Sequence, residues 1–559
     1  MSSLKIAHFT SGDITGGAAR GAYFLHQSIE KYTNIKSLFY IAELGDENRN
    51  TKIRYLNNSI QDSLHQYRNR NFEKYLLSYY EKEAQDLFSI GLGSFDKEII
   101  EISKQVDIVH LHWINDQMLS LEAIKGIKVP IVWTFRDMWP FTGGCHYSKG
   151  CNKYISLCGN CPILKSEEQL DLSKIIYEKK LNNITKNNLY PVALSNWVKE
   201  CAENSYLFSD KNIFVIPNCI DTNVFKIHEK KAVRMELALP INKKIILYGA
   251  INSFADQRKG FKFLKEALEK MRNKNQYYLI TFGGEDGGLL MELGFQYTHF
   301  GKISDDKLLS KIYSSADVFV APSIEEAFGK TIAEAMSSGT PVVAFDSTGP
   351  KDIITHKIDG YLAEPYNSND LLLGIDWIVQ NEKKDLLNQN ARKKIEKNYS
   401  SKIIARKYEE LYKEILEDSS NKIVLDYTTD MLKIKNTQMK SSTIAFEDFL
   451  EKQINQFNKW YIFDVNKIRH LRNQKIAIYG TGSFGRELLE VLNSYQIQVD
   501  CFIDSSIEKQ GKYLDNIKIK NVEECSNHFI FVASTWFEEI EQTLLLHRTN
   551  KNSYLICMK

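Results

Sequence analysis

The chain has 559 residues, of which 43% are hydrophobic and 25% are charged, and its formal net charge is +2. This composition is typical of globular proteins and excludes the fibrous and disordered classes, and so small a net charge gives no general attraction to nucleic acid. The length exceeds what one hydrophobic core usually supports, so we expect two to four domains.

The distribution of apolar residues indicates where in the cell the protein is expected. No apolar segment approaches the roughly 18 residues needed to span a bilayer. The first residues, MSSLKIAHFTSGD, begin a predicted strand and lack the pattern of a signal peptide. We therefore expect a cytoplasmic protein whose nine cysteines are mostly reduced.

Short apolar segments that are followed by helical patterns recur along the chain. In the first half these segments are KIAHFTS, VDIVHLHW, VPIVWTF, YPVALSN and NIFVIPN. In the second half they are KKIILYGA, YYLITFGG, ADVFVAPS and TPVVAF. Because such runs are typical of parallel strands covered on both faces, we predict an α/β protein with two facing Rossmann-like domains, residues 1–222 and 223–416. The closing helix, residues 397–416, has an amphipathic pattern that suits packing back on the first domain.

The rest of the chain is predicted to form a linker with a helical segment, residues 417–473, and a smaller Rossmann-like α/β domain, residues 474–559. In this domain QKIAIYGTGSFGRELLEVL is typical of a strand, a glycine-rich turn and a helix. The turn matches G-x-G-x-x-G, and an acid follows at about the separation of a dinucleotide-binding fold. NAD or another nucleotide is one expected ligand; the alternative is a domain that kept the turn and lost the ligand. The residues concerned are Gly480, Gly482, Gly485 and Asp504.

Two acids in SIEEAFGKTIAEAMSSGTPVV, residues 323–343, indicate a ligand site. Glu326 precedes a predicted helix and Glu334 lies inside it. Helix N-termini beyond the ends of parallel strands offer N–H groups and a favourable dipole to a phosphate. Glu334 can then accept hydrogen bonds from ribose hydroxyls. Glu326 can accept hydrogen bonds from the hydroxyls of a different group attached to the same diphosphate. The alternative is two solvated acids, which the flanking Phe-Gly and Gly-Thr-Pro make a poor explanation.

The segment EEAFGKTIAEAMSSGTPVVA resembles the E-x(7)-E signature of the retaining glycosyltransferases of family 4, which have the GT-B fold. The likeness covers roughly the first three quarters of the chain and includes GGAARGAYFLHQSI, SNWV, PNCID and RKGFKFLKEAL. The segments WTFRDMWPFTGGCHY and CGNCP are similar to a branch that acts in bacterial capsule, exopolysaccharide and lipopolysaccharide assembly. The resemblance implies a hexosyltransferase that uses a UDP- or GDP-sugar and a saccharide acceptor, expected to be lipid-linked.

The resemblance also implies roles for individual residues. Glu326 would contact hydroxyls of the donor sugar, Glu334 would contact the ribose, and Lys259 would neutralise the leaving diphosphate. A lysine in isolation is more often a surface charge. The expected catalytic residues are Glu326, Lys259, Arg136 and Asp137. The other expected donor contacts are Gly16 and Gly17 at the start of the first helix, Arg258, and the backbone of Phe328, Gly329, Lys330 and Thr331.

The sequence departs from the family at three points. Arg136 stands where the family commonly has a histidine that meets the donor sugar; an arginine can hold an anion or a hydroxyl but cannot act as a base at neutral pH. The family's diphosphate-binding arginine has no counterpart at Asn252 and Ser253, so Arg258 is the candidate substitute. Cys219 replaces the glycine of the family's Asn-Gly-Ile-Asp.

Retaining transfer of this type needs no enzymic nucleophile. The acceptor hydroxyl attacks on the face that the diphosphate leaves, and a phosphate oxygen takes its proton. The chain has no D-x-D motif, so we expect no metal or other cofactor for the chemistry. Two alternatives stay open: a nucleotide-sugar epimerase of the same architecture and, because of Arg136, a scaffold that binds nucleotide-sugar or a partner without turnover.

Few residues mark the acceptor side. His110 and His112 are predicted to point to opposite faces of a strand, so that at most one faces the cleft; His112 is the candidate acceptor contact, and a satisfied core histidine is the alternative. Residues 64–88 mix Arg and Lys with Tyr and Phe at helical spacing. This pattern favours a core-facing helix, with peripheral contact at the inner face of the cytoplasmic membrane as the sharper hypothesis.

Cysteines cluster in CHYSKGCNKYISLCGNCP. In a reducing compartment such a cluster favours metal over disulfides, and Cys-Gly-Asn-Cys can present two thiolates to one ion. We predict a structural zinc bound by Cys145, Cys151, Cys158 and Cys161, with His146 as a substitute for one ligand. The alternative without metal is that these are small buried side chains that pack a loop.

Overall fold

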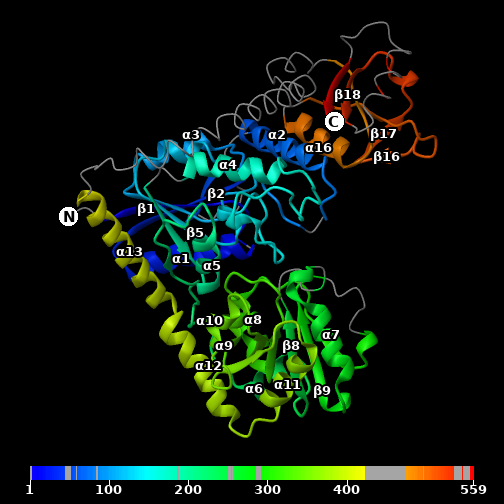
Figure 1. Ribbon diagram of the computed structural model, residues 1–559. Helices are drawn as coiled ribbons and strands as arrows, with labels where there is room; N and C mark the ends of the chain where they lie inside the picture. Colours follow the sequence, from blue (N-terminus) through cyan, green and yellow to red (C-terminus); the bar gives the residue numbers. More distant parts are fainter. Residues whose placement is uncertain are drawn as a thin grey trace. The chain divides into compact units, whose positions relative to one another are not determined.

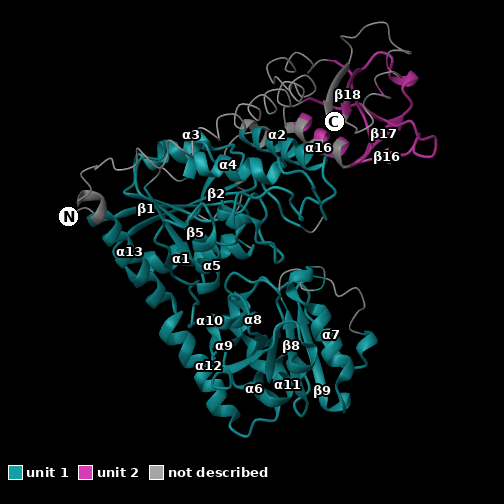
Figure 2. Cartoon of the chain, viewed as in Figure 1, with its two compact units in different colours: residues 1–425 teal, residues 426–559 magenta. Residues whose placement is uncertain are grey.

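The structure is a computed structural model. It describes residues 3–14, 16–44, 52–57, 60–83, 86–184, 188–249, 254, 256–284, 291–421, 474–494, 497–533, 540, 544 and 554–558. The chain divides into two compact units, residues 1–425 and residues 426–559 (Figures 1 and 2). The first unit contains two lobes, each built on a parallel sheet.

The N-terminal lobe contains a parallel sheet whose seven described strands run in the order β3-β2-β1-β4-β5-β6-β7. Central strands such as β4 and β5 are buried along their whole length, as expected for parallel strands covered on both faces. The strands are β1 (Lys5–Thr10), β2 (Lys36–Leu44), β3 (Arg54–Asn57), β4 (Ile108–Leu111), β5 (Ile131–Phe135), β6 (Leu189–Ala193) and β7 (Phe214–Val215). The helices are α1 (Gly17–Tyr32), α2 (Ile60–Leu77), α3 (Asp96–Ser103), α4 (Leu172–Ile184) and α5 (Asn196–Asn204).

The second lobe repeats this architecture with six described strands in the order β10-β9-β8-β11-β12-β13. All its strand pairs are parallel. The strands are β8 (Lys244–Gly249), β9 (Tyr277–Phe282), β10 (Gln296–His299), β11 (Val318–Ala321), β12 (Val342–Phe345) and β13 (Gly360–Ala363). The helices are α6 (Lys230–Glu236), α7 (Phe261–Lys270), α8 (Asp306–Ser315), α9 (Lys330–Ser337), α10 (Pro350–Ile353) and α11 (Ser368–Val379).

Two helices close the first unit, α12 (Lys384–Asn398) and α13 (Ser401–Asn421). The sequence predicted one helix over residues 397–416, but the chain breaks after α12. At the break Ile220 donates its N–H to Tyr399 and accepts the N–H of Ser401, at 2.8 and 3.0 Å. These backbone bonds to another segment end one helix and start the next, which a helical periodicity cannot reveal.

Helix α13 belongs to the hydrophobic core of the N-terminal lobe. Its buried side chains pack with those of β1 and α1, on which it lies (Figure 1). Two of its tyrosines also bond to the sheet: the Tyr408 hydroxyl lies 2.9 Å from Thr134 Oγ1, and the Tyr412 hydroxyl lies 2.6 Å from His110 Nδ1. The chain thus returns from the second lobe to complete the first.

The second unit contains a mixed sheet with the described strand order β16-β17-β15-β14-β18-β19. Only β16 and β17 pair in antiparallel fashion among these strands. The elements are β14 (Ile476–Tyr479), α16 (Ser483–Ser494), β15 (Cys501–Ile503), β16 (Tyr513–Leu514), β17 (Ile517–Lys520), β18 (Phe529–Ala533) and β19 (Tyr554–Met558). The predicted strand, turn and helix are therefore present as β14 and α16.

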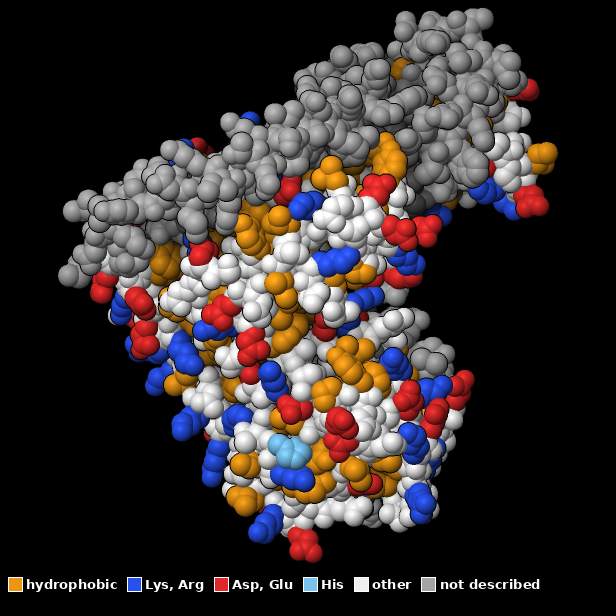
Figure 3. All heavy atoms as spheres, viewed as in Figure 1, with side chains coloured by type: hydrophobic (Ala, Val, Ile, Leu, Met, Phe, Trp, Pro, Cys, Tyr) orange, Lys and Arg blue, Asp and Glu red, His pale blue; other side chains and the backbone are white. Residues whose placement is uncertain are grey.

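Some predictions lie outside the described residues. Residues 417–421 end α13, and residues 422–473 of the predicted linker are not among those described; nor are Asn252 and Ser253. Among the described helices, none combines the length and the apolar character needed to cross a membrane. On the face shown in Figure 3, acidic and basic side chains are interspersed over both lobes, so this face has no field of one sign.

Candidate active site

Helix α9 begins at the carboxyl end of β11, where the sequence predicted a phosphate-binding helix. Gly329 caps the helix with φ of +99°, a left-handed conformation that favours glycine. The Phe328 side chain is 2% exposed and packs in the lobe core, so only its backbone can meet a ligand. Thr331, in the first turn, is half-buried. The N-terminus of α9 therefore directs N–H groups toward the sheet edge, where the Gly329 N–H donates to Glu326.

Glu326 and Lys259 form an ion pair beside this helix. Lys259 Nζ donates to Glu326 Oε2 at 2.6 Å, and each side chain is less than a fifth exposed. Burial alone would raise the pKa of Glu326, but the charges of Lys259 and Arg258 outweigh it and hold that pKa below its ordinary value. Glu326 is therefore a carboxylate at neutral pH, and a cation and an anion stand together at the sheet edge.

Arg258 extends the positive charge toward the other lobe. Its guanidinium lies 4.0 Å from the centre of the Tyr147 ring, and its Nη2 donates to Asp256 at 2.6 Å. Burial would lower the pKa of Arg258, but Tyr147, Asp256 and Glu326 together raise it. A permanent cation thus stands next to Lys259, on the side where Tyr147 of the N-terminal lobe meets it.

Glu334 is buried one turn inside α9. It accepts a hydrogen bond from the Tyr313 hydroxyl at 3.2 Å and pairs with Lys330 at 2.9 Å. The Lys330 ammonium also lies 4.5 Å from the ring centre of Phe24 in α1. Burial lowers the pKa of Lys330, and the Glu334 carboxylate opposes that shift. The first turn of α9 is thus in contact with α1 of the opposite lobe.

Further contacts join the two lobes around these residues. Arg20 of α1 pairs with Asp306, and Glu325 accepts hydrogen bonds from the Ser148 hydroxyl at 3.3 Å and the Lys149 N–H at 3.1 Å. At the start of α1, the Gly16 N–H is engaged by Asp13, and a side chain at Gly17 would meet no atom within 4 Å. The N-terminus of α1 therefore has open space where a ligand can approach.

Arg136 is buried in the N-terminal lobe directly after β5. Its Nη1 donates to Asn218, its Nη2 lies 3.1 Å from His112 Nδ1, and Gly21 of α1 leaves room for it. His112 also lies 3.0 Å from His8, so both nitrogens of His112 have protein partners. Burial lowers the pKa of His112, which keeps that ring neutral. His112 therefore orients Arg136.

The prediction that His110 and His112 point to opposite faces of a strand is wrong. Their ring centres lie 4.1 Å apart, on one side of the sheet. The physical reason is the two-residue period of a strand, by which residues two apart share a face. Both rings are buried.

Asp137 has a full set of donors inside the N-terminal lobe. Its carboxylate accepts hydrogen bonds from Trp113 Nε1 at 2.9 Å, His146 Nδ1 at 2.6 Å and the Trp139 N–H at 2.9 Å. The other nitrogen of His146 lies 2.9 Å from Ser89 Oγ. Asp137 thus fixes the loop after β5, and His146 has no free nitrogen for a metal.

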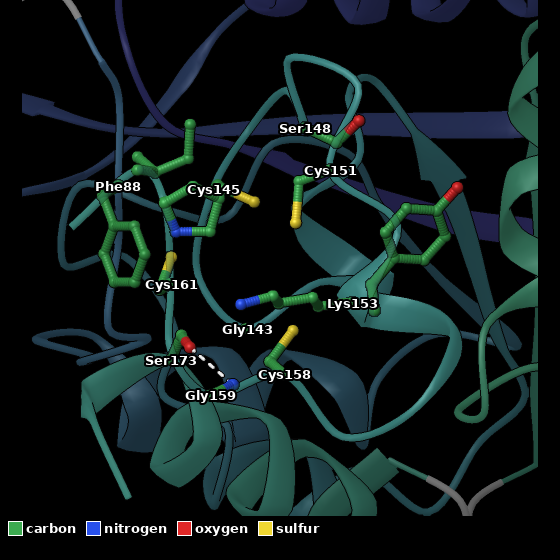
Figure 4. Close-up of a pocket in the computed structure, with 13 residues that line it drawn as sticks. Phe88, Gly143, Cys145, Ser148, Cys151, Lys153, Cys158, Gly159, Cys161 and Ser173 are labelled. Atoms are coloured by element: carbon green, nitrogen blue, oxygen red, sulfur yellow. Dashed lines mark hydrogen bonds between the residues drawn. The ribbon is translucent and has the colours of Figure 1, made fainter. Parts of the chain in front are cut away.

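The predicted cysteine cluster lines one cavity in the loop between β5 and α4 (Figure 4). Burial raises the pKa of Cys145, Cys158 and Cys161 in the absence of metal.

In the second unit, the glycine-rich turn and its acid lie together. A side chain at Gly485 would overlap the Gly480 carbonyl at 1.9 Å, so close packing of α16 on β14 requires glycine. At Gly482 no atom lies within 4 Å of an added side chain. The Asp504 carboxylate bonds to the Thr481 hydroxyl and to Lys509 at 3.0 Å. A nucleotide ribose would have to compete with both partners.

Three residues that shape the first unit's site were not predicted from the sequence. Tyr147 stacks on Arg258, Glu325 ties the lobes together, and Tyr313 bonds to Glu334. Tyr147 and Glu325 lie inside the quoted motifs, next to predicted site residues, so their positions in the sequence could have identified them as candidates. Tyr313 comes from α8 and carries no local signal, because its contact depends on tertiary packing.

Comparison with known proteins yields two family matches. Residues 230–398 match the model of glycosyl transferases group 1, and residues 472–553 match a family described as C2185-like, N-terminal. The first match contains both glutamates and the lysine of the site. The second covers the glycine-rich turn of the C-terminal unit.

Individual relatives cover more of the chain. An uncharacterized glycosyltransferase of Methanocaldococcus jannaschii is 28% identical over 271 residues, 46% of this chain and 67% of the relative. The lipopolysaccharide 1,2-N-acetylglucosaminetransferase of Salmonella typhimurium is 25% identical over 218 residues, 36% of this chain and 56% of that protein. The crystal structure of Anabaena Alr3699/HepE in complex with UDP-glucose aligns with a TM-score of 0.53 at 16% identity, over 74% of this chain and all of that one, which shows the shared fold. Residues 230–398 are therefore those of a group 1 glycosyltransferase, and the first unit has the GT-B fold, with an additional C-terminal domain in the chain.

Proposed function

We propose that the protein transfers a hexosyl group, with retention of configuration, from a UDP- or GDP-sugar to a lipid-linked saccharide in bacterial surface polysaccharide synthesis. The observation that carries this proposal is the Lys259–Glu326 ion pair at the N-terminus of α9, with Glu334 one turn inside. The name of the Salmonella relative and the UDP-glucose complex of the Anabaena protein support the pathway and the donor class.

The donor diphosphate would bind where positive charge converges. Arg258, Lys259 and the N–H groups of Gly329 to Thr331 surround one region of the sheet edge. These fixed charges would stabilise the negative charge that develops as the diphosphate leaves, a contribution of about 10²–10³ in rate for one such donor group.

The two glutamates would hold the two ends of the donor. When a phosphate of the donor pairs with Lys259 in place of Glu326, the Glu326 carboxylate can accept hydrogen bonds from sugar hydroxyls. Glu334 keeps acceptor capacity beyond its bonds to Tyr313 and Lys330, which suits the ribose hydroxyls. The acceptor hydroxyl would attack from the face that the diphosphate leaves and pass its proton to a phosphate oxygen.

Arg136 would act on the N-terminal side of the cleft. Its guanidinium cannot take a proton at neutral pH, so its role is to hold a hydroxyl or an anionic group. His112 and Asn218 fix its orientation. His112 would then affect the acceptor side only through Arg136.

We place this reaction in the cytoplasm, at the inner face of the membrane that carries the acceptor. Tyr79 and Leu87, after α2, are 60% and 54% exposed, which suits shallow contact with lipid headgroups. Co-sedimentation with anionic liposomes at low salt is the check, and protein that stays in the supernatant would contradict it.

A donor and acceptor screen tests the proposed function. Full-length protein is incubated with a panel of UDP- and GDP-sugars, with and without lipid-linked saccharides. We expect released nucleoside diphosphate together with a glycosylated acceptor, and a loss of about 10²–10³ in rate for Lys259→Met. Isomerised donor sugar would instead identify an epimerase, and binding without any product would identify the scaffold that Arg136 motivates.

A further inference from the structure

The loop between β5 and α4 gathers thiols around a space the size of one ion. The cavity has a volume of about 20 Å³, and Lys153, Tyr154 and Ser173 also line it (Figure 4). A volume on the order of 10–15 Å³ admits one water-sized sphere. The four cysteines that line it are free thiols: Cys145, Cys151, Cys158 and Cys161.

The backbone around two of these thiols is arranged to donate hydrogen bonds to sulfur. The Cys161 sulfur receives the N–H groups of Ile163 and Leu164, and the Cys158 sulfur receives the N–H of Gly143. Such donors stabilise a thiolate and orient it, as outer partners of metal ligands do. The bond from Gly143 to Cys158 also joins two separate parts of the loop.

Two lysines lie near these thiols. Lys180 is fully buried over the Trp139 ring and donates to the carbonyls of Trp139 and Thr142. Lys153 points toward the cavity and donates to the Asn160 carbonyl (Figure 4). Four thiolates around a divalent cation carry a net charge of about −2, which the Lys153 ammonium would reduce.

We propose that Cys145, Cys151, Cys158 and Cys161 bind one structural zinc ion. His146 is not a ligand, because Asp137 and Ser89 engage both of its nitrogens. The sulfurs ring the cavity: among the described residues, no three of these thiols come within 4.8 Å of one another. Binding therefore requires the cysteine side chains to turn inward, and four thiol protons leave to solvent as four metal–sulfur bonds form.

The ion would stiffen the loop that reaches the donor lobe. Tyr147, Ser148 and Lys149 lie between the first two ligands and make the contacts with Arg258 and Glu325. The zinc has four protein ligands and no open position, so its effect on transfer is through this loop.

Metal content of the full-length protein tests the site. We expect about one equivalent of zinc in protein purified without chelator, and a tetrahedral thiolate absorption spectrum after exchange with Co²⁺. Cys158→Ser and Cys161→Ser should each lose most of the metal and the spectrum. Cys201→Ser, at a half-buried cysteine outside the cavity, should keep both.

Less than about a tenth of an equivalent of zinc in zinc-supplemented wild-type protein, with all four thiols freely titratable, would overturn the proposal. So would four cysteines found as two disulfides. If the serine variants fail to fold, the cobalt spectrum and the thiol titration of the wild-type protein still decide the question.

Discussion

Glu326 and Glu334 belong to one short motif, but their surroundings give them different properties. Glu326 lies just before α9, where Lys259 pairs with it at 2.6 Å. Glu334 is buried and shared between Tyr313 and Lys330. The side chains of Lys259 and Glu326 are 17% and 19% exposed, whereas that of Glu334 is 4% exposed, so a ligand can reach the first pair more readily. We therefore expect a substitution of Glu326 to change recognition of the donor sugar, and a substitution of Glu334 to change affinity for the nucleotide.

Another carboxyl gives a pH-dependent prediction. Glu73 of α2 accepts hydrogen bonds from the Ile90 N–H and Gln117 Nε2, both at 2.6 Å, and burial raises its pKa to about 7. The ordinary pKa of a glutamate, which we take for the unfolded chain, is 4.5. Between these values the folded state holds a proton that the unfolded state has lost, so this group's contribution to stability falls as pH rises through that window.

Glu73→Gln carries no such proton and should escape this loss. Relative to wild type, the variant should gain stability between pH 5 and pH 8, by no more than about 3 kcal/mol. Denaturant midpoints at the two pH values are the measurement. Glu101→Gln, at an exposed site, should show no such gain. A parallel pH dependence of Glu73→Gln and wild type would contradict the assignment.

At the scale of elements, a single glycine sets the start of α7 and the position of Lys259. Gly260 has φ of +69°, and a side chain there would lie 1.8 Å from the Pro322 carbonyl. Gly294 has nearly the same φ, +70°, with no atom within 4 Å. Comparing alanine substitutions at the two glycines therefore distinguishes the cost of backbone strain from the cost of steric overlap.

We expect Gly294→Ala to cost about 1–2 kcal/mol of unfolding free energy, the usual cost of a left-handed residue. Gly260→Ala should cost at least about 2 kcal/mol more, because the overlap is with backbone, and should weaken donor binding through Lys259. Chemical denaturation and donor titration check both effects. Equal losses for the two variants would show that Pro322 does not constrain Gly260.

The sequence predicted well what local patterns encode. Apolar strands and the glycine before α9 gave the α/β class and the helix that carries Glu334. The break at Tyr399 depends on Ile220, which is far away in the chain, so local periodicity could not reveal it. Asp137 likewise takes one of its donors, Trp113, from a different strand end. The error over His110 and His112 was different in kind, because the strand period itself places them on one face.

At the scale of the whole molecule, α13 is the last helix of the first unit, and it packs in the core of the N-terminal lobe. Its buried residues complete the core around β1 and α1, and Tyr408 and Tyr412 bond to β5 and β4. A chain that ends at residue 425 retains this helix, and one that ends at residue 399 loses it. The two truncations therefore test which segments the N-terminal lobe needs.

We expect the chain 1–425 to be monodisperse, to unfold cooperatively and to release nucleoside diphosphate from its donor. The chain 1–399 should aggregate or lose cooperative unfolding, because the apolar side chains of β1 and α1 that pack against α13 become exposed to solvent. Size-exclusion chromatography and thermal unfolding compare the two. Equal behaviour would contradict the role of α13 in the core.

The stereochemistry of the new glycosidic bond distinguishes retention from inversion. The donor is an α-linked nucleotide-sugar that full-length protein turns over, and the anomeric configuration of the new linkage is followed by NMR from the first turnovers. A retaining transferase that uses Lys259, Glu326 and the N-terminus of α9 gives an α-linked product, and Lys259→Met gives the same anomer about 10²–10³ times more slowly. A β-linked product, or a Lys259→Met rate equal to that of wild type, would contradict the account.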